Sequence, residues 1–327
     1  MKEPKISKNT PNQTDRILFF DVLRIGFVAL IVYGHSQFFP LLSLNKILYM
    51  DGFAPFNIYP LGLTGLAVYG MIFVSGAVLE YNYKGIERFS EYVKFLVKRC
   101  IRLYPAFWMS LLFGMLVLYP VVSKAGIFNV LFEYTGFYVI LGQGSGIYNN
   151  MGWFIATIMS LYLLFPLLSK IVKKYQFSSI VVFLLVSFLC RFLLITYNVV
   201  PIDLFYRWFP LCNLFEFGLG IYIVQNKLYP QNVTSYPIIR QLSDLSYYVF
   251  LFHWIIGMCL FNYTINNIQL FYISNILGIN NLIIEPVIDY CVFITLVLFV
   301  SWVAMVLDKQ IQQKILTSDS VKKFMKS

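Results

Sequence analysis

Long apolar stretches alternate with short polar stretches along the whole chain of 327 residues. Eight of the apolar stretches are roughly 20 residues long, the length that an α-helix needs to cross the hydrocarbon core of a membrane. They cover residues 17–39, 60–82, 100–119, 151–169, 178–197, 209–226, 244–262 and 287–307. Two weaker apolar stretches, 127–142 and 265–284, also have the composition to cross. The pattern predicts an all-α, polytopic integral membrane helix bundle of 8 to 10 transmembrane helices.

The composition supports this prediction. Hydrophobic residues make up 59% of the chain, charged residues make up only 12%, and the mean hydropathy is +0.72. A soluble core cannot hide so much apolar surface. No internal repeat or soluble domain is visible. We therefore expect one membrane domain over residues 17–308, between an N-terminal tail, 1–16, and a C-terminal tail, 309–327.

The net charge of +10 raises the question of a nucleic-acid partner, but the lysines and arginines cluster between the apolar stretches. Basic residues in such short loops mark the cytoplasmic side of a membrane. With eight spans and both termini cytoplasmic, every cluster lies on that side of the plasma membrane. With ten spans, four lysines would move to the outer side of the membrane: Lys170, Lys173, Lys174 and Lys227. The charges favour eight spans with two interfacial or re-entrant pieces, and a lipid bilayer rather than nucleic acid as the partner.

The cysteines are few and scattered. There are five, mostly inside apolar stretches: Cys100, Cys190, Cys212, Cys259 and Cys291. An odd number without ligand spacing indicates neither a disulfide framework nor a zinc site, so we expect small core residues and no metal.

Ionisable residues inside membrane spans are costly, so each needs a partner or a function. The first stretch contains Asp21, Arg24 and His35. The step from Arg24 to His35 turns an α-helix by about 20° beyond whole turns and rises about 16 Å, so both side chains share one face. Asp21 precedes Arg24 by three residues and can pair with it. One interpretation is a neutralising pair with His35 in the outer interface. The other is a polar stripe lining a cavity, with His35 as general base.

Two further sites are open to two interpretations each. Arg99 and Arg102 are three residues apart, so their guanidinium groups can point the same way and grip phosphate oxygens, or they can serve as an ordinary cytoplasmic anchor. His253 is the second of only two histidines. A hydrogen-bonded structural role suits it as well as a functional one.

Five motifs in order resemble the acyltransferase-3 family of polytopic membrane acyltransferases. "FFDVLRIGFVALIVYGH" is similar to that family's first helix, with Asp, Leu-Arg and then His after ten residues. The other four are "MIFVSG" at 71–76, "RCIRLYP" at 99–105, "GWFIATIMSLYLLFP" at 152–166 and "LSYYVFLFH" at 245–253. The resemblance covers most of the chain.

The resemblance implies an O-acetyltransferase that moves an acyl group, commonly acetyl, from cytoplasmic acyl-coenzyme A to a hydroxyl of a carbohydrate. It implies that Arg24 and His35 are catalytic and that Arg99 and Arg102 contact the donor. In such a site we assign Asp21 to hold Arg24 in place. It also implies about ten helices, which conflicts with the charge pattern. Substrate-binding residues are then expected among Ser75, Trp153, Tyr162, His253 and Glu216.

Several alternatives stay open. Ser75 is either a covalent nucleophile or, with Gly76, part of a close helix contact. Glu216 either pairs with Arg191 or binds the acceptor. Many relatives carry acidic residues where this chain has Ile158 and Met159, so the acceptor cannot be inferred from the family. The main rival functions are a transporter or flippase, and a non-catalytic assembly protein.

Overall fold

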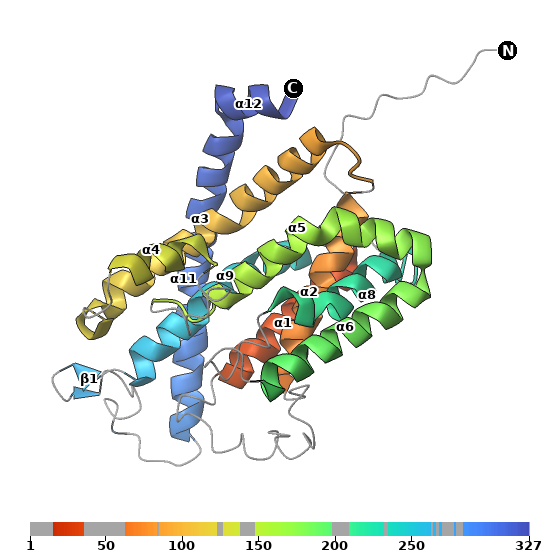
Figure 1. Ribbon diagram of the computed structural model, residues 1–327. Coiled ribbons are helices and arrows are strands. Elements are labelled where there is room, and N and C mark those ends of the chain that lie inside the picture. Colours follow the sequence, from red (N-terminus) through yellow and green to blue (C-terminus); the bar gives the residue numbers. More distant parts are fainter. Residues whose placement is uncertain are drawn as a thin grey trace.

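The computed structural model describes residues 16–35, 63–83, 85–122, 127–137, 148–197, 209–231, 235–262, 264–265, 268–269, 278 and 284–326. These residues are almost entirely helical (Figure 1). Seven of the helices are long and apolar enough to cross a membrane. The prediction of an all-α polytopic membrane protein is confirmed. The predicted N-terminal tail lies outside the described residues except for Arg16.

Seven of the eight strong apolar stretches form these long helices. They are α1 (Leu18–His35), α2 (Leu63–Asn82), α3 (Phe89–Val122), α5 (Gly152–Tyr175), α6 (Phe177–Thr196), α9 (Pro237–Gly257) and α11 (Ile284–Thr317). α9 continues into a π-helical turn, η5 (Met258–Asn262). The eighth stretch forms a short 3₁₀ turn, η4 (Pro210–Asn213), and then α8 (Leu214–Gln225). The 12 residues of α8 extend only about 18 Å, less than the hydrocarbon thickness.

The two weaker stretches add no crossing helix within the described residues. α4 (Ile127–Thr135) has 9 residues, too few to span a bilayer. The stretch 265–284 is described only in part, including the two-residue strands β1 (Thr264–Ile265) and β2 (Ile268–Gln269), which pair antiparallel. Residues 309–317, expected to begin the C-terminal tail, continue α11 and lead into α12 (Asp319–Lys326).

The seven long helices and α8 pack in two groups. α11, α9, α1, α2, α8 and α6 form a row in which each helix contacts the next. α3 packs against α9 and α11, and α5 packs against α2, α6 and α8, so this second pair covers one face of the row (Figure 1). α1 therefore has α9 on one side and α2 on the other, although α9 comes more than 200 residues later in the chain.

Basic side chains from three separate parts of the chain meet around one carboxylate. Asp244, near the start of α9, contacts Arg16 just before α1, Arg102 on α3 and Lys309 near the end of α11. We call this the basic end of the bundle. The start of α1 and the end of α11 therefore lie at the same end.

The ends of α2, α5 and α8 lie at this end as well. Glu80 near the end of α2 accepts hydrogen bonds from Ser169 of α5, at 2.7 Å, and from Gln225 of α8, at 3.0 Å. The ring of Tyr229, just after α8, packs against that of Phe20 at the start of α1, with ring centroids 5.4 Å apart. This arrangement agrees with the alternation of helices that the charge pattern predicts for eight stretches.

Glycines bring α2 and α8 into close contact. A Cβ atom on Gly76 of α2 would lie 2.2 Å from the carbonyl oxygen of Phe217, and one on Gly220 of α8 would lie 2.2 Å from that of Phe73. Real Cβ atoms do not approach oxygen so closely, so only glycine fits. The interpretation of Ser75-Gly76 as a close-packing site is supported at Gly76.

Gly76→Ala should therefore destabilise the bundle by about 1–3 kcal/mol, because α2 and α8 must move apart to accommodate the methyl group. Gly26→Ala on α1 is the matched control, since a Cβ there meets nothing within 4 Å. Thermal unfolding of both variants in the same detergent measures the difference. Equal melting temperatures would contradict the inferred contact.

Candidate active site between helices α1 and α9

A line of polar side chains follows the contact between α1 and α9. It contains Asp21, Arg24 and His35 from α1 and Ser243 and His253 from α9. We call this line the α1/α9 seam. The two helices run in the same direction, because Asp21 meets Ser243 near their starts and His35 meets His253 near their ends. The predicted catalytic residues of α1 therefore share one interface.

Ser243 links Asp21 to Arg24. Its hydroxyl donates to Asp21 Oδ1 at 2.7 Å and accepts from Arg24 Nη1 at 3.2 Å. The two charged groups form no direct ion pair in the described structure, which corrects the expected Asp21–Arg24 pair. A hydroxyl both donates and accepts, so a serine on the neighbouring helix can join the two groups where helical spacing alone does not. Asp21 itself is buried.

The two histidines of the chain meet at the other end of the seam. His35 Nδ1 and His253 Nε2 are 2.8 Å apart, and their rings are inclined by only 6°. The ring of Trp254 packs edge-on against His35, with centroids 5.3 Å apart. His253 is completely buried, whereas His35 is partly exposed.

The partners of His253 determine the direction of the hydrogen bond between the rings. His253 Nδ1 lies 2.8 Å from the carbonyl oxygen of Phe250 and 3.1 Å from that of Val249. Carbonyl oxygens only accept, so Nδ1 of His253 carries the proton. In the neutral ring, Nε2 must then accept, and His35 Nδ1 is the donor. The neutral His35 is left with its lone pair on Nε2, the atom that a general base uses.

Arg24 belongs to a wider group of charges. It interacts electrostatically with Asp21, Arg102 and Arg16. Arg102 Nη2 is 3.3 Å from Asp244 Oδ1. The predicted donor-binding Arg102 therefore lies at the basic end, next to the start of the seam.

Arg99 takes a different direction from Arg102. Its Nη2 donates to the Tyr83 hydroxyl at 2.6 Å, and its guanidinium lies 4.9 Å from the centroid of the Tyr83 ring and 5.9 Å from that of Phe95. Its Nε is buried without a hydrogen-bond partner among the described residues. The expectation that both guanidinium groups share one target is not met, because each has its own partner, Tyr83 just after α2 for Arg99 and Asp244 on α9 for Arg102.

Ser75 and Tyr162 come together from separate motifs. Their hydroxyl oxygens are 2.8 Å apart, joining α2 to α5. Tyr162 also interacts electrostatically with Arg24, which places this pair beside the seam. No base adjoins Ser75 in the described structure other than this phenol, so a role as nucleophile has no support.

Arg191 and Glu216 form a buried ion pair away from the seam. Arg191 Nη2 lies 3.3 Å from Glu216 Oε1, and the two side chains are 0% and 8% exposed. Arg191 also donates to the carbonyl of Cys212 and lies 4.7 Å from the centroid of the Tyr69 ring. The predicted pairing of Arg191 with Glu216 is confirmed, and acceptor binding by Glu216 stays a prediction.

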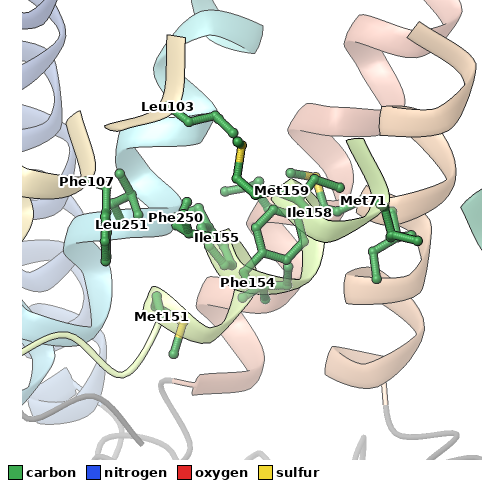
Figure 2. Packing of buried hydrophobic residues seen from close by; sticks show 14 of the residues in the cluster. Met71, Leu103, Phe107, Met151, Phe154, Ile155, Ile158, Met159, Phe250 and Leu251 are labelled. Carbon is green, nitrogen blue, oxygen red and sulfur yellow. The ribbon is translucent and has the colours of Figure 1, made fainter. Parts of the chain in front are cut away.

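The middle of α5 is apolar core. Figure 2 shows Ile158 and Met159 packed among hydrophobic side chains of the neighbouring helices, and both are buried. Trp153, at the start of the same helix, packs edge-on against Phe154. No acidic group is available at 158 and 159 for acceptor binding.

A family model described as an acyltransferase domain matches residues 17–239. The match covers more than half of the chain. The chain belongs to the acyltransferase-3 family. No curated protein and no solved structure matches it significantly.

The matched region of this membrane acyltransferase includes all of α1 and α3 but ends at the start of α9. Ser243, Asp244 and His253 therefore lie beyond it. The α9 half of the seam is placed by the fold rather than by the family match.

Sequence reasoning missed three residues of the acyltransferase that contact the predicted site. Ser243 joins Asp21 to Arg24, Asp244 holds Arg102, and Arg16 pairs with Asp244 at 2.5 Å. A polar Ser-Asp pair at the start of an otherwise apolar stretch was the available signal. Its partners before α1, on α1 and on α3 are more than 140 residues away in sequence, so the signal did not reveal them.

Proposed function

We propose that this acyltransferase moves an acyl group, most readily acetyl, from cytoplasmic acyl-coenzyme A to a hydroxyl of a cell-surface or lipid-linked carbohydrate. The observation that carries the proposal is the 2.8 Å contact between His35 and His253. A histidine whose Nδ1 proton is held by a second, oriented histidine has the arrangement expected of a general base. A thioester is already activated for acyl transfer. The enzyme must still remove the proton of the acceptor hydroxyl, and this step requires such a base.

In the proposed reaction, His35 Nε2 removes the proton from the acceptor hydroxyl as its oxygen attacks the thioester carbonyl carbon. The C–S bond then breaks, the ester is released, and the thiolate of coenzyme A takes the proton from His35. Arg24, held by Ser243 at the start of the seam, contributes positive charge that stabilises bound anions. His253 keeps the His35 ring in the tautomer and orientation that the first step needs.

Donor and acceptor are proposed to approach from opposite ends of the seam. The basic end contains Arg102 and its cationic neighbours, as expected of a side that faces cytoplasmic coenzyme A. His35 and His253 lie at the other end, about 16 Å along α1 from Arg24. The long pantetheine arm of the donor suits this separation.

The experiment uses sealed vesicles that contain the protein and externally oriented cellular glycans. Labelled acetyl-coenzyme A is supplied on the cytoplasmic side of these vesicles. Mass spectrometry then compares the glycans of vesicles from cells with the protein and from cells without it. We expect a mass increase of one acetyl group per modified sugar, together with the label, on the external glycans. Acetylation confined to the cytoplasmic leaflet, or none at all, would contradict the proposal.

The role of His253 can be separated from a structural role. His253→Ala should lower kcat by about 10- to 100-fold with little change in KM, because His35 loses the acceptor that orients it. His253→Gln should recover part of kcat, since its amide oxygen can accept from His35 Nδ1. Steady-state kinetics of the two variants measure this difference. An equal loss of kcat in both would assign His253 a packing role.

A further inference from the structure

Three cations from separate parts of the chain converge on Asp244. Its Oδ1 lies 2.5 Å from Arg16 Nη2 and 3.3 Å from Arg102 Nη2, and its Oδ2 lies 3.3 Å from Lys309 Nζ. The cations come from the residues before α1, from α3 and from α11. One carboxylate thus fixes the positions of three basic side chains that have no proximity in sequence.

The carboxylates around this cluster do not neutralise it. Asp244 compensates one of the three cations. Asp308 is the next carboxylate and interacts electrostatically with Arg102 and Lys309, while its Oδ2 accepts hydrogen bonds from Tyr248 and Gln312. With both carboxylates counted, one positive charge remains. Arg24 and Asp21 alongside balance each other.

The described hydrogen bonds use only some of the N–H donors of these cations. A guanidinium has five N–H donors, and Arg102 uses only Nη2 in its described hydrogen bond. Arg16 uses Nη1 for the carbonyl of Arg240 and Nη2 for Asp244. The side chains of Arg16, Arg102 and Lys309 are 30%, 32% and 45% exposed, so an anion can reach them. Planar guanidinium groups with free edges match phosphate oxygens.

We propose that Arg16, Arg102 and Lys309, gathered by Asp244, form the subsite for the phosphate groups of the donor nucleotide. This assignment rests on the proposed function and deepens it. It adds Arg16 and Lys309, which the Arg99/Arg102 motif does not contain. It also removes Arg99 from the subsite, since Arg99 is held against Tyr83.

The position of the subsite agrees with the chemistry of the donor. Asp244 and His253 are nine residues apart on α9, which corresponds to about 14 Å along the helix. In an acyl-coenzyme A, the phosphates and the reactive thioester lie at opposite ends of an extended molecule. Phosphates at Asp244 and the thioester near His35 therefore use both ends of the seam at once.

The test measures binding without any acyl transfer. Purified protein in nanodiscs of neutral phosphatidylcholine is titrated with coenzyme A and, separately, with inorganic pyrophosphate. The double variant Arg16→Gln/Lys309→Gln should raise the Kd for coenzyme A at least tenfold. The control Lys314→Gln/Lys322→Gln removes the same two charges from exposed positions of α11 and α12 and should change the Kd less than twofold.

Single variants keep the test informative if the double variant unfolds. Arg16→Gln and Lys309→Gln should each raise the Kd about threefold, with melting temperatures close to that of the unaltered protein. Equal Kd values for test and control variants would overturn the proposal, as would failure of the unaltered protein to bind coenzyme A.

Two further outcomes separate this proposal from others. If coenzyme A binding depends on Arg16 and Lys309 but no acyl group is transferred, the subsite stands and the proposed function fails. If transfer occurs and the variants bind coenzyme A normally, the function stands and the subsite fails.

Nanodiscs with anionic phosphatidylglycerol form a second arm of the experiment. If the variants lose only their interaction with this lipid, the cations bind lipid phosphate, which would overturn the donor assignment.

Discussion

His35→Ala should reduce acyl transfer by about 100- to 10,000-fold while the protein remains folded and inserted in the membrane. The loss is expected because His35 Nε2 is the only described basic atom of the seam that a neighbouring ring orients. Arg24 is a permanent cation and cannot serve as a base. Labelled acetyl transfer in vesicles, normalised to the amount of inserted protein, measures the effect.

The control for His35→Ala is Tyr33→Phe, two residues earlier on α1, which should retain most of the activity. Melting temperatures of both variants show whether α1 is still packed against α9. Undiminished transfer by a folded His35→Ala variant would remove the histidine from the mechanism. It would then favour a carrier or an assembly protein, for which neither Arg24 nor His35 need be essential.

Glu216→Ala should lower the free energy of unfolding by about 3–5 kcal/mol, because Arg191 would lose its carboxylate in a fully buried position. The matched control is Glu91→Ala. Glu91 pairs with Arg88 on the surface, where both side chains are well exposed. The melting temperature of the Glu91→Ala variant should therefore hardly change. Thermal unfolding in detergent measures both variants.

A double variant separates the pair's charge from its packing. Arg191→Met with Glu216→Leu replaces both charged groups by apolar groups of similar size, and it should recover most of the stability lost in Glu216→Ala. Acyl transfer by this double variant should stay near normal, since the pair lies away from the seam. A large loss of transfer at normal stability would instead indicate that Glu216 binds the acceptor.

The membrane architecture was predictable because hydropathy is a local property. A stretch of about 20 apolar residues becomes a helix wherever it lies, and seven stretches did so. The predicted span at 209–226 did not form a crossing helix, and the reason is also local. Pro210 begins a 3₁₀ turn there, so only 12 residues remain for α8. Glycine contacts hold this short helix against α2.

The site was predictable only within single helices. Helical spacing placed Arg24 and His35 on one face, and both do lie in the contact with α9. Spacing could not reveal that Ser243 would join Asp21 to Arg24, or that Arg99 and Arg102 would find different partners. Those outcomes depend on which helices become neighbours. The pairing of the only two histidines, 218 positions apart, is the clearest such case.

Two hydrogen-bonded contacts fasten α1 to α9 at well-separated levels, one through Ser243 and one through His253. A register change of α9 by a single residue would move it by about 1.5 Å and turn it by about 100°, which would point the His253 ring away from His35 and break the 2.8 Å contact. The proton-accepting nitrogen is thus correctly set in only one axial alignment of these helices. Because Asp244 and His253 lie on the same helix, we expect a ligand that displaces Asp244 along the axis of α9 to displace His253 from His35 as well.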